Sequence, residues 1–111
     1  YNEFDENDFD AYHLFIDNKG EIIAYARAFQ IDKNKATFGR VVVSKEYRGK
    51  LLGKMIVKKT LEVIKGIEKV TIIEIEAQEY LRSFYESFGF VKTSEPFDDG
   101  GVMHITMVLK I

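Results

Sequence analysis

The chain has 111 residues, of which 46% are hydrophobic and 14% aromatic; this composition fits one domain with a core and excludes a disordered segment. The formal net charge of −2 argues against nucleic acid as a main partner, and the absence of cysteine excludes disulfides, cysteine-based metal sites and an acyl-cysteine intermediate. No apolar run reaches membrane-spanning length and no signal peptide is recognisable, so we expect a cytoplasmic protein that forms a single domain over residues 1–111.

Two strands joined by a hairpin open the predicted fold. Apolar and β-branched side chains alternate with polar ones over residues 12–16 and 21–29, and Asp-Asn-Lys-Gly at residues 17–20 is typical of a hairpin turn. After a polar break at residues 32–35, residues 36–43 predict a third, central strand.

Helical spacing replaces the strand pattern after residue 51. The apolar stripe of the predicted helix consists of Leu52, Ile56, Val63, Ile64 and Ile67. Lysines occupy its outer face, and Gly66 is expected to end it. The remaining pattern predicts a strand over residues 69–76, a second helix over 80–88 that ends at Gly89, an extended segment over 90–92, a loop over 96–101 and a closing strand over 102–109.

These elements predict an α+β fold. The strand–helix–strand unit over residues 36–76 requires a right-handed crossover, which makes its two strands parallel. The hairpins on either side make the other strand pairs antiparallel. We therefore predict a mixed, mostly antiparallel sheet with a central parallel βαβ unit flanked by helices, and a ligand site at the carboxyl ends of the central strands.

A basic turn with two glycines, residues 48–54, follows the apolar run Val41-Val42-Val43 and opens the first predicted helix. The first N–H groups of a helix have no intrahelical partner and carry partial positive charge, and glycines let a ligand come close to them. Lys45, Arg48, Lys50 and Lys54 add full positive charges. The turn therefore predicts a site for phosphate or pyrophosphate; the alternative is an ordinary solvated turn.

This turn resembles the acetyl-coenzyme A loop of the GCN5-related N-acetyltransferases, the GNAT family. The family pattern is Gln or Arg, two residues, Gly, one residue, then Gly or Ala. Here it reads Arg48-Gly49-Lys50-Leu51-Leu52-Gly53, with Leu51 in place of the usual glycine. Residues 85–90, Tyr-Glu-Ser-Phe-Gly-Phe, resemble the family's Tyr-x-x-x-Gly-Phe signature. Residues 39–44, 77–81 and 95–101, together with His104 and Met107, are similar to the ElaA-like branch of the family.

The resemblance implies an acyl-CoA N-acyltransferase fold and an N-acetyltransferase that uses acetyl-CoA as cosubstrate, with no metal. It covers nearly all of this chain, but the family's first strand and one or two helices have no counterpart, which indicates a fragment. The residues that it assigns to cofactor binding are Val41, Val42, Val43, Arg48, Gly49, Lys50, Leu51, Leu52, Gly53, Lys54 and Gln78.

The resemblance also implies a mechanism. In the family, the tyrosine of the second signature protonates the leaving thiolate, a role that falls here to Tyr85; the alternative is a core aromatic residue. A backbone N–H near Val42 would polarise the thioester carbonyl where the two central strands diverge. A primary amine would then attack directly. For the general base, Glu76, His104 and a water molecule remain alternatives.

Two other classes of function stay open. The chain would be a non-catalytic acyl-CoA binding module if the turn binds the cofactor and Tyr85 only packs in the core. It would be a phosphate-binding or protein-interaction domain if the turn meets a different anion. The sequence does not identify the acceptor amine, although Asp98 and Asp99 are placed to attract a cation. It is compatible with a homodimer, and we expect no membrane partner.

Overall fold

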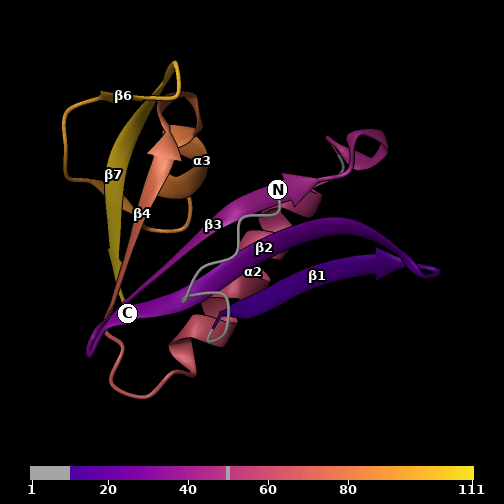
Figure 1. The fold of residues 1–111 in the computed structure, drawn as a ribbon, viewed down its shortest axis with the longest axis horizontal. Coiled ribbons are helices and arrows are strands. Elements are labelled where there is room, and N and C mark those ends of the chain that lie inside the picture. Colours follow the sequence, from indigo (N-terminus) through magenta and orange to yellow (C-terminus); the bar gives the residue numbers. More distant parts are fainter. Residues whose placement is uncertain (1–10, 50) are drawn as a thin grey trace.

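The computed structural model describes residues 11–49 and 51–111, which form one sheet with helices packed against it (Figure 1). Within these residues, seven strands pair in the order β1-β2-β3-β4-β7-β5, with β6 paired to β7. In chain order the elements are β1 (Tyr12–Asn18), β2 (Glu21–Asp32), β3 (Lys35–Val43), the 3-10 turn η1 (Lys45–Tyr47), α2 (Leu52–Lys65), β4 (Ile72–Gln78), the 3-10 turn η2 (Glu79–Leu81), α3 (Arg82–Glu86), β5 (Val91–Lys92), β6 (Phe97–Asp99) and β7 (Val102–Lys110).

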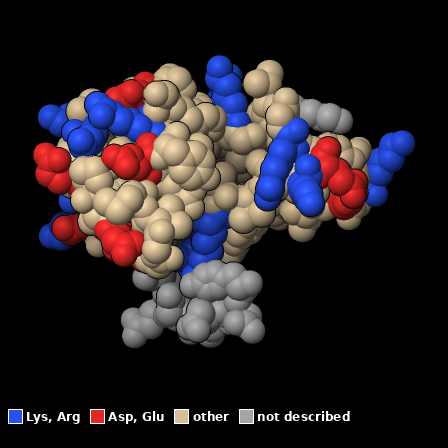
Figure 2. Space-filling view, turned by 90° about the horizontal axis from the view of Figure 1, so that it is seen from above, with Lys and Arg blue, Asp and Glu red and all other residues tan. Residues whose placement is uncertain are grey.

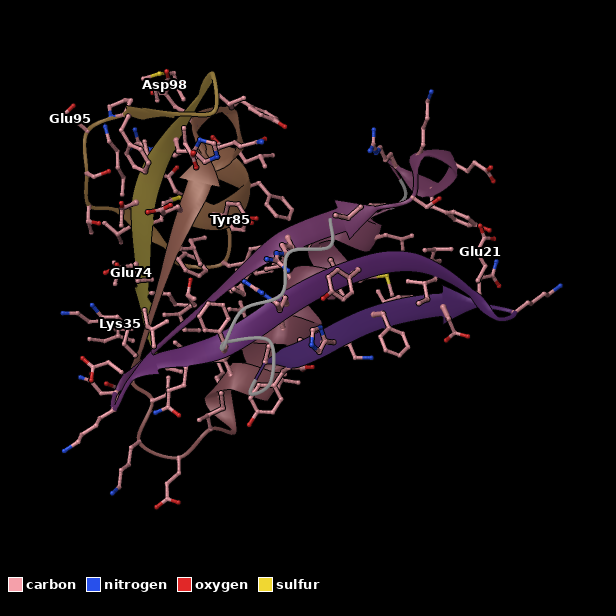
Figure 3. The ribbon with its side chains drawn as sticks, in the orientation of Figure 1. Glu21, Lys35, Glu74, Tyr85, Glu95 and Asp98 are labelled. Carbon is pink, nitrogen blue, oxygen red and sulfur yellow. The ribbon has the colours of Figure 1, made fainter. Side chains whose placement is uncertain are left out.

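β3 and β4 form the parallel pair at the centre of the sheet, and they pair only where they begin. In the described part of the chain their register joins Lys35 to Ile72 and Ala36 to Ile73 and goes no further. The Lys35 Nζ lies 3.3 Å from the Glu74 Oε1 at this junction (Figure 3). Beyond it the two strands diverge and leave a V-shaped opening (Figure 1). The predicted parallel unit with diverging strands is therefore confirmed, and the other strand pairs are antiparallel.

The helix α2 crosses from β3 to β4 and covers one face of β1, β2 and β3 (Figure 1). Its predicted apolar stripe faces the sheet, where Ile56 and Ile64 are fully buried. The opposing positions of β2 are Ala24, Ala26 and Ala28, and these small side chains let the helix approach the sheet closely. Burial of this stripe is the main stabilising contribution of α2, at roughly 1.5–3 kcal/mol for each large apolar side chain. The helix ends as predicted at Gly66, whose N–H donates to the Val63 carbonyl at 3.0 Å.

The predicted loop over residues 96–101 is wrong, because it contains the strand β6. Gly100 and Gly101 adopt φ values of 65° and 86°, which two-residue hairpin turns require and which glycine allows without strain. The Asp98 Oδ1 accepts a hydrogen bond from the Gly101 N–H at 2.9 Å and closes the turn. The chain therefore returns at once and pairs β6 with β7.

Two other elements differ from the prediction in their bounds, for local reasons. The strand predicted over residues 69–76 begins at Ile72 because Lys69 has a φ of 70°, outside the extended region, and it continues to Gln78. The helix predicted over residues 80–88 is shorter: η2 precedes it, and α3 itself has five residues. 3-10 turns are frequent at helix ends, and here the Arg82 N–H donates to the Glu79 carbonyl within the turn.

The surface carries charges of both signs. Seen from above, acidic and basic side chains are interspersed over the described atoms in view, without a continuous basic surface on this face (Figure 2). Nucleic-acid binding depends on such a surface. Among the described helices, none is long and apolar enough to cross a membrane.

Candidate active site

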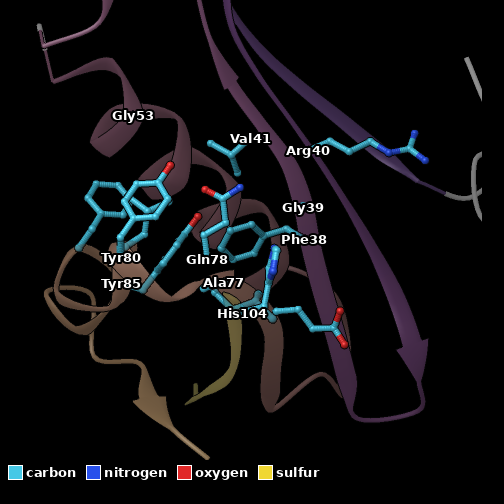
Figure 4. Close-up of a pocket in the computed structure, with 14 residues that line it drawn as sticks. Phe38, Gly39, Arg40, Val41, Gly53, Ala77, Gln78, Tyr80, Tyr85 and His104 are labelled. Atoms are coloured by element: carbon cyan, nitrogen blue, oxygen red, sulfur yellow. The ribbon is translucent and has the colours of Figure 1, made fainter. Parts of the chain in front are cut away.

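The V-shaped opening between β3 and β4 holds a cleft of about 470 Å³ (Figure 4). Its walls come from β3, β4, β7, η2, α3 and the first turn of α2, which are distant in sequence. Six residues expected from the sequence line the cleft: Val41, Gly53, Glu76, Gln78, Tyr85 and His104. The other expected residues that the structure describes do not line the cleft; they are Val42, Val43, Arg48, Gly49, Leu51, Leu52 and Lys54. Lys50 lies outside the described residues.

A β-bulge in β3 sets the shape of the cleft edge. The register pairs Arg27 with Gly39 and Tyr25 with Val42, so β3 has one more residue than β2 between these pairs. Arg40 has a φ of 53°, the left-handed conformation that such a bulge uses. After the bulge, the Val41 side chain points into the cleft, whereas Val42 is 55% exposed (Figure 4).

Backbone groups at the end of β3 are available to a ligand. The Ser44 N–H donates to the Ile23 carbonyl of β2 at 2.8 Å. Successive peptide groups of a strand point to opposite sides, so the N–H and carbonyl of Val43 are directed toward the opening. The Arg48 Nε donates to this same Val43 carbonyl at 3.3 Å and holds the basic turn against the strand end.

The basic turn leads into α2 through two left-handed residues. Gly49 has a φ of 82°, and Leu51, at the N-cap of α2, has a φ of 65°. Glycine would adopt the second conformation without strain, whereas leucine loses roughly 1–2 kcal/mol there. The Leu51 side chain is 71% exposed, so it occupies solvent rather than the core. Gly53 lies one residue into the helix, where a Cβ would approach the Phe84 ring to 3.9 Å.

Tyr85 is the one titratable group of the cleft that is buried, with 6% of its surface exposed. Its ring contacts those of Phe38, Phe84 and Phe90, at centroid distances of 6.2, 5.0 and 6.0 Å. Burial, with a smaller contribution from Tyr80, raises the pKa of the Tyr85 hydroxyl. The hydroxyl therefore stays protonated at neutral pH and can donate a hydrogen bond or a proton, and it projects toward the cleft (Figure 4).

Three polar side chains form a row on the sheet beside Tyr85. Gln78 of β4 pairs with His104 of β7, and Glu76 lies two residues before Gln78 on the same face. The His104 Nδ1 lies 2.9 Å from the Val102 carbonyl oxygen. Because that oxygen can only accept, Nδ1 carries a proton in this arrangement, which leaves Nε2 as the ring nitrogen that faces a ligand. The described residues contain no group of three or more His, Asp or Glu that could hold a metal ion.

Two polar residues of this cleft, Tyr80 and Arg40, were not expected from the sequence. Tyr80 of η2 lines it with a hydroxyl directed the same way as that of Tyr85 (Figure 4). Arg40 carries the bulge, and the only sequence signal for it is that Gly39-Arg40 interrupts the strand just before the apolar run Val41-Val42-Val43.

Comparisons with known proteins identify the family of this chain. The profile described as "Acetyltransferase (GNAT) domain" matches residues 2–111. Protein ElaA of Escherichia coli K12 is 32% identical over 115 aligned residues, which cover all of this chain and 75% of that protein. The UPF0039 protein sll0451 of Synechocystis is 35% identical over 118 aligned residues, which cover all of this chain and 74% of that protein.

Solved structures share the fold. The crystal structure of Escherichia coli ElaA matches with a TM-score of 0.86 at 33% identity, over 97% of this chain and 75% of that one. A GNAT family acetyltransferase from Elizabethkingia anophelis with acetyl-CoA bound matches with a TM-score of 0.79 at 14% identity, over 96% of this chain and 80% of that one; this likeness concerns the fold alone. The chain has the acyl-CoA N-acyltransferase fold and belongs to the GNAT acetyltransferase family, with similarity to ElaA.

Proposed function

We propose that the protein transfers the acetyl group of acetyl-CoA to a primary amine by direct attack within a ternary complex. The observation that carries this proposal is the cleft, where a bulged strand, the first turn of α2, a buried phenol and two candidate bases meet. Family membership and the acetyl-CoA bound to a structure of the same fold support acyl-CoA as the cosubstrate.

The cofactor would occupy the opening as an additional strand. Its pantetheine arm pairs with the outward peptide groups at the end of β3, as in β-augmentation by a peptide. Its pyrophosphate lies at the start of α2, where the amides of residues 51–53 point outward and Arg48 and Lys54 supply positive charge. Leu52 is buried and contributes its backbone only. Gln78, on the opposite wall, donates its side-chain amide to the pantetheine.

The acetyl carbonyl would lie near the bulge of β3. An N–H there polarises the carbonyl and stabilises the negative charge that develops during attack. The sequence predicts an N–H near Val42 for this role. Peptide groups alternate in direction along a strand, which favours the residues on either side of Val42, and of these Val41 lines the cleft. The neutral amine forms the new N–C bond as the C–S bond breaks. Tyr85 donates its proton to the departing thiolate, and the proton lost by the amine restores the phenol through the base or water.

His104 and Glu76 remain the candidates for that base. His104 would act through Nε2, because its other ring nitrogen is engaged with the Val102 carbonyl. Glu76 is exposed and has no hydrogen bond or ion pair within the described part of the chain, so its carboxylate is available to an ammonium group. A water molecule held by either side chain would serve equally well.

A non-catalytic acyl-CoA binding module is the second candidate, favoured by one observation. Tyr85 packs against three aromatic rings and would be retained for packing alone. In that case the cofactor binds but no acetyl group moves.

One experiment separates these functions. Acetyl-CoA is incubated with the protein and a panel of primary amines, and free thiol is measured over time, with thermal melting of the same samples. We expect a raised melting temperature with acetyl-CoA and thiol release with at least one amine. A raised melting temperature without amine-dependent thiol release would favour the binding module. The absence of both the raised melting temperature and the thiol release would overturn both candidates.

A further inference from the structure

The side chain of His104 is held in place from two directions at the edge of the cleft. Its Nδ1 lies 2.9 Å from the Val102 carbonyl oxygen. Its ring stacks on that of Phe97, with the two centroids 6.2 Å apart and the two planes inclined by 27°. The other polar side chains of the row, Gln78 and Glu76, have no hydrogen bond or ring contact within residues 11–49 and 51–111. Of the row, His104 is therefore the member whose orientation the fold fixes.

Both contacts come from the hairpin of β6 and β7. Phe97 of β6 pairs directly with His104 of β7, so the two rings lie on the same face of the sheet. The turn between the strands is closed by the hydrogen bond from the Gly101 N–H to the Asp98 Oδ1 at 2.9 Å. On its other side β7 pairs with β4, which places Gln78 opposite His104. The hairpin therefore holds His104 from one side, and the cleft lies on the other.

The two contacts restrict different properties of the imidazole ring. The Val102 carbonyl can only accept, so the hydrogen bond selects, in the neutral ring, the tautomer with its proton on Nδ1. The last torsion of a histidine side chain is broad and roughly twofold, so a ring without contacts exchanges its nitrogens by turning over. The Phe97 ring lies against the imidazole and hinders this rotation. Together they leave Nε2 without a proton and facing the cleft, where it can accept one.

Glu76 is placed to assist His104 rather than to replace it. Gln78 pairs with His104 and Glu76 pairs with Thr106, so Glu76 is the diagonal neighbour of His104 on the same face of the sheet. A carboxylate at this position stabilises a positive charge on the imidazole. Its own side chain is exposed, and no contact within the described residues fixes its direction.

From these contacts we infer that the β6–β7 hairpin sets His104 as the base of the reaction, with Phe97 as its positioning residue. The inference rests on the proposed function, because it assigns the base that was left open there. As the amine forms the N–C bond and the C–S bond breaks, the amine nitrogen loses a proton to Nε2 and the thiolate takes the proton of Tyr85. The imidazolium, stabilised by Glu76, then returns a proton through water to the phenolate, so both groups regain their starting states.

The first test reads the tautomer and needs no activity. Long-range proton–nitrogen correlation spectra by nuclear magnetic resonance distinguish protonated from unprotonated ring nitrogens in the full-length protein, at about pH 9, where histidine side chains are ordinarily neutral. His104→Gln identifies the signals of His104 by their loss. We expect a protonated Nδ1 and an unprotonated Nε2 in the parent and in Phe97→Tyr, which keeps a ring, and values averaged between the two tautomers in Phe97→Leu. A protonated or averaged Nε2 in the parent, or an unchanged tautomer in folded Phe97→Leu, would overturn the inference.

Kinetics separate a positioning role of Phe97 from a structural one. His104→Gln should lower kcat about a hundredfold or more, the usual contribution of a general base, and Glu76→Gln should lower it about tenfold or less. Phe97→Leu should lower kcat about tenfold and leave the KM for acetyl-CoA close to that of the parent. The matched control is Phe15→Leu, the same substitution at an exposed position of β1, which should leave kcat unchanged.

The double variant shows whether Phe97 acts through His104. If it does, Phe97→Leu combined with His104→Gln should be no slower than His104→Gln alone, because the ring that Phe97 positions is already absent. Losses of kcat that add up in the double variant, or a larger loss in Glu76→Gln than in His104→Gln, would contradict the assignment.

The tautomer and the kinetics distinguish failure of this inference from failure of the proposed function. The expected tautomer without thiol release from acetyl-CoA in the parent would overturn acetyl transfer, and with it the role of His104 as a base, while the hold of the hairpin on the ring stands. Thiol release that His104→Gln leaves unchanged would support the transfer and overturn the assignment of the base.

Discussion

In the proposed function, the chemistry of the cleft depends most directly on the hydroxyl of Tyr85. Tyr85→Phe removes one oxygen and retains the ring contacts with Phe84 and Phe90. We expect turnover to fall about a hundredfold or more, the usual contribution of a positioned proton donor. The free energy of unfolding should change by no more than about 1 kcal/mol, the typical value of one hydrogen bond. Thiol-release kinetics and urea unfolding of the same samples measure both.

Tyr12→Phe is the matched control, because Tyr12 is exposed on β1 and does not line the cleft. Parent turnover in the Tyr85→Phe variant would remove the phenol from the mechanism and leave Tyr85 as a core residue. A large loss of stability with unchanged turnover would have the same meaning.

The buried phenol also predicts a dependence of stability on pH. Burial raises the pKa of Tyr85 above its ordinary value of 10.0, so on alkalinisation the unfolded chain loses this proton before the folded chain does. The contribution of the neutral phenol is complete below that ordinary value and is lost as the pH rises through the folded-state pKa. Between about pH 8 and about pH 11, the free energy of urea unfolding should therefore fall more in the parent than in Tyr85→Phe. Equal losses would mean that the hydroxyl ionises as freely in the fold as in water.

The roles of single residues could be predicted from the sequence only where chemistry fixes the residue type. Tyr85, Gln78 and His104 were singled out by motif or by side-chain chemistry, and all three line the cleft. The stacking of Phe97 on His104 could not be predicted, because it depends on the pairing of β6 with β7. The φ of 65° at Leu51 is likewise invisible in a residue type that rarely adopts it.

At the scale of elements, the bulge in β3 is the feature that shapes the cleft edge. Arg40→Gly and Arg40→Val both remove the same side chain, so any contact that Arg40 makes is lost equally in the two variants. Glycine adopts the observed φ of 53° without strain, whereas the β-branched valine favours an extended strand without a bulge. We expect Arg40→Gly to keep the melting-temperature shift caused by coenzyme A, and Arg40→Val to lose most of it.

The stabilities of the two variants without ligand also test whether the left-handed conformation at residue 40 is needed. Arg40→Val should be less stable than Arg40→Gly by about 1–2 kcal/mol, the cost of a left-handed conformation for a side chain with a Cβ. Equal stability and equal coenzyme A shifts in the two variants would show that the bulge does not position the cofactor.

Elements with strong periodicity could be predicted well, and those formed by short-range turns could not. The stripe that includes Ile56 and Ile64 identified α2, because burial of one helix face leaves a regular trace in the sequence. The segment from Pro96 to Gly101 contains the same signals for a loop as for a tight hairpin. Pairing with β7 decides between them, and that is a long-range contact.

At the scale of the whole molecule, the meeting of six elements at the cleft follows from topology rather than from any one motif. The parallel pair of β3 and β4 could be inferred from the helix between them, and with it the opening at their carboxyl ends. The bulge between the pairs Arg27–Gly39 and Tyr25–Val42 could not, since it depends on the register of β2 and β3. A slip of one residue would turn Arg27 to the other face.

In the proposed function, acetyl-CoA would bind only where β3, α2 and β4 are assembled, so cofactor binding would be a property of the whole fold. Ligand at a hundred times its Kd should stabilise the protein by about 2.7 kcal/mol, and the melting temperature should rise with dose. Gly53→Asp places a carboxylate at the start of α2, where the phosphate would bind. The nearest atom to its Cβ is 3.9 Å away, so the fold accepts the side chain.

The effects of Gly53→Asp on the apoprotein and on the complex should have opposite signs. An acidic residue in the first turn interacts favourably with the helix dipole by about 0.3–1 kcal/mol, and loss of a helical glycine adds a similar amount. The apoprotein should therefore melt at the same temperature as the parent or higher, while the shift caused by coenzyme A disappears. Gly53→Ala shares the gain in helix propensity without the charge, so it should keep the shift. Thermal melting of the three proteins with and without coenzyme A decides the point: a parent-like shift in Gly53→Asp would place the pyrophosphate away from the start of α2.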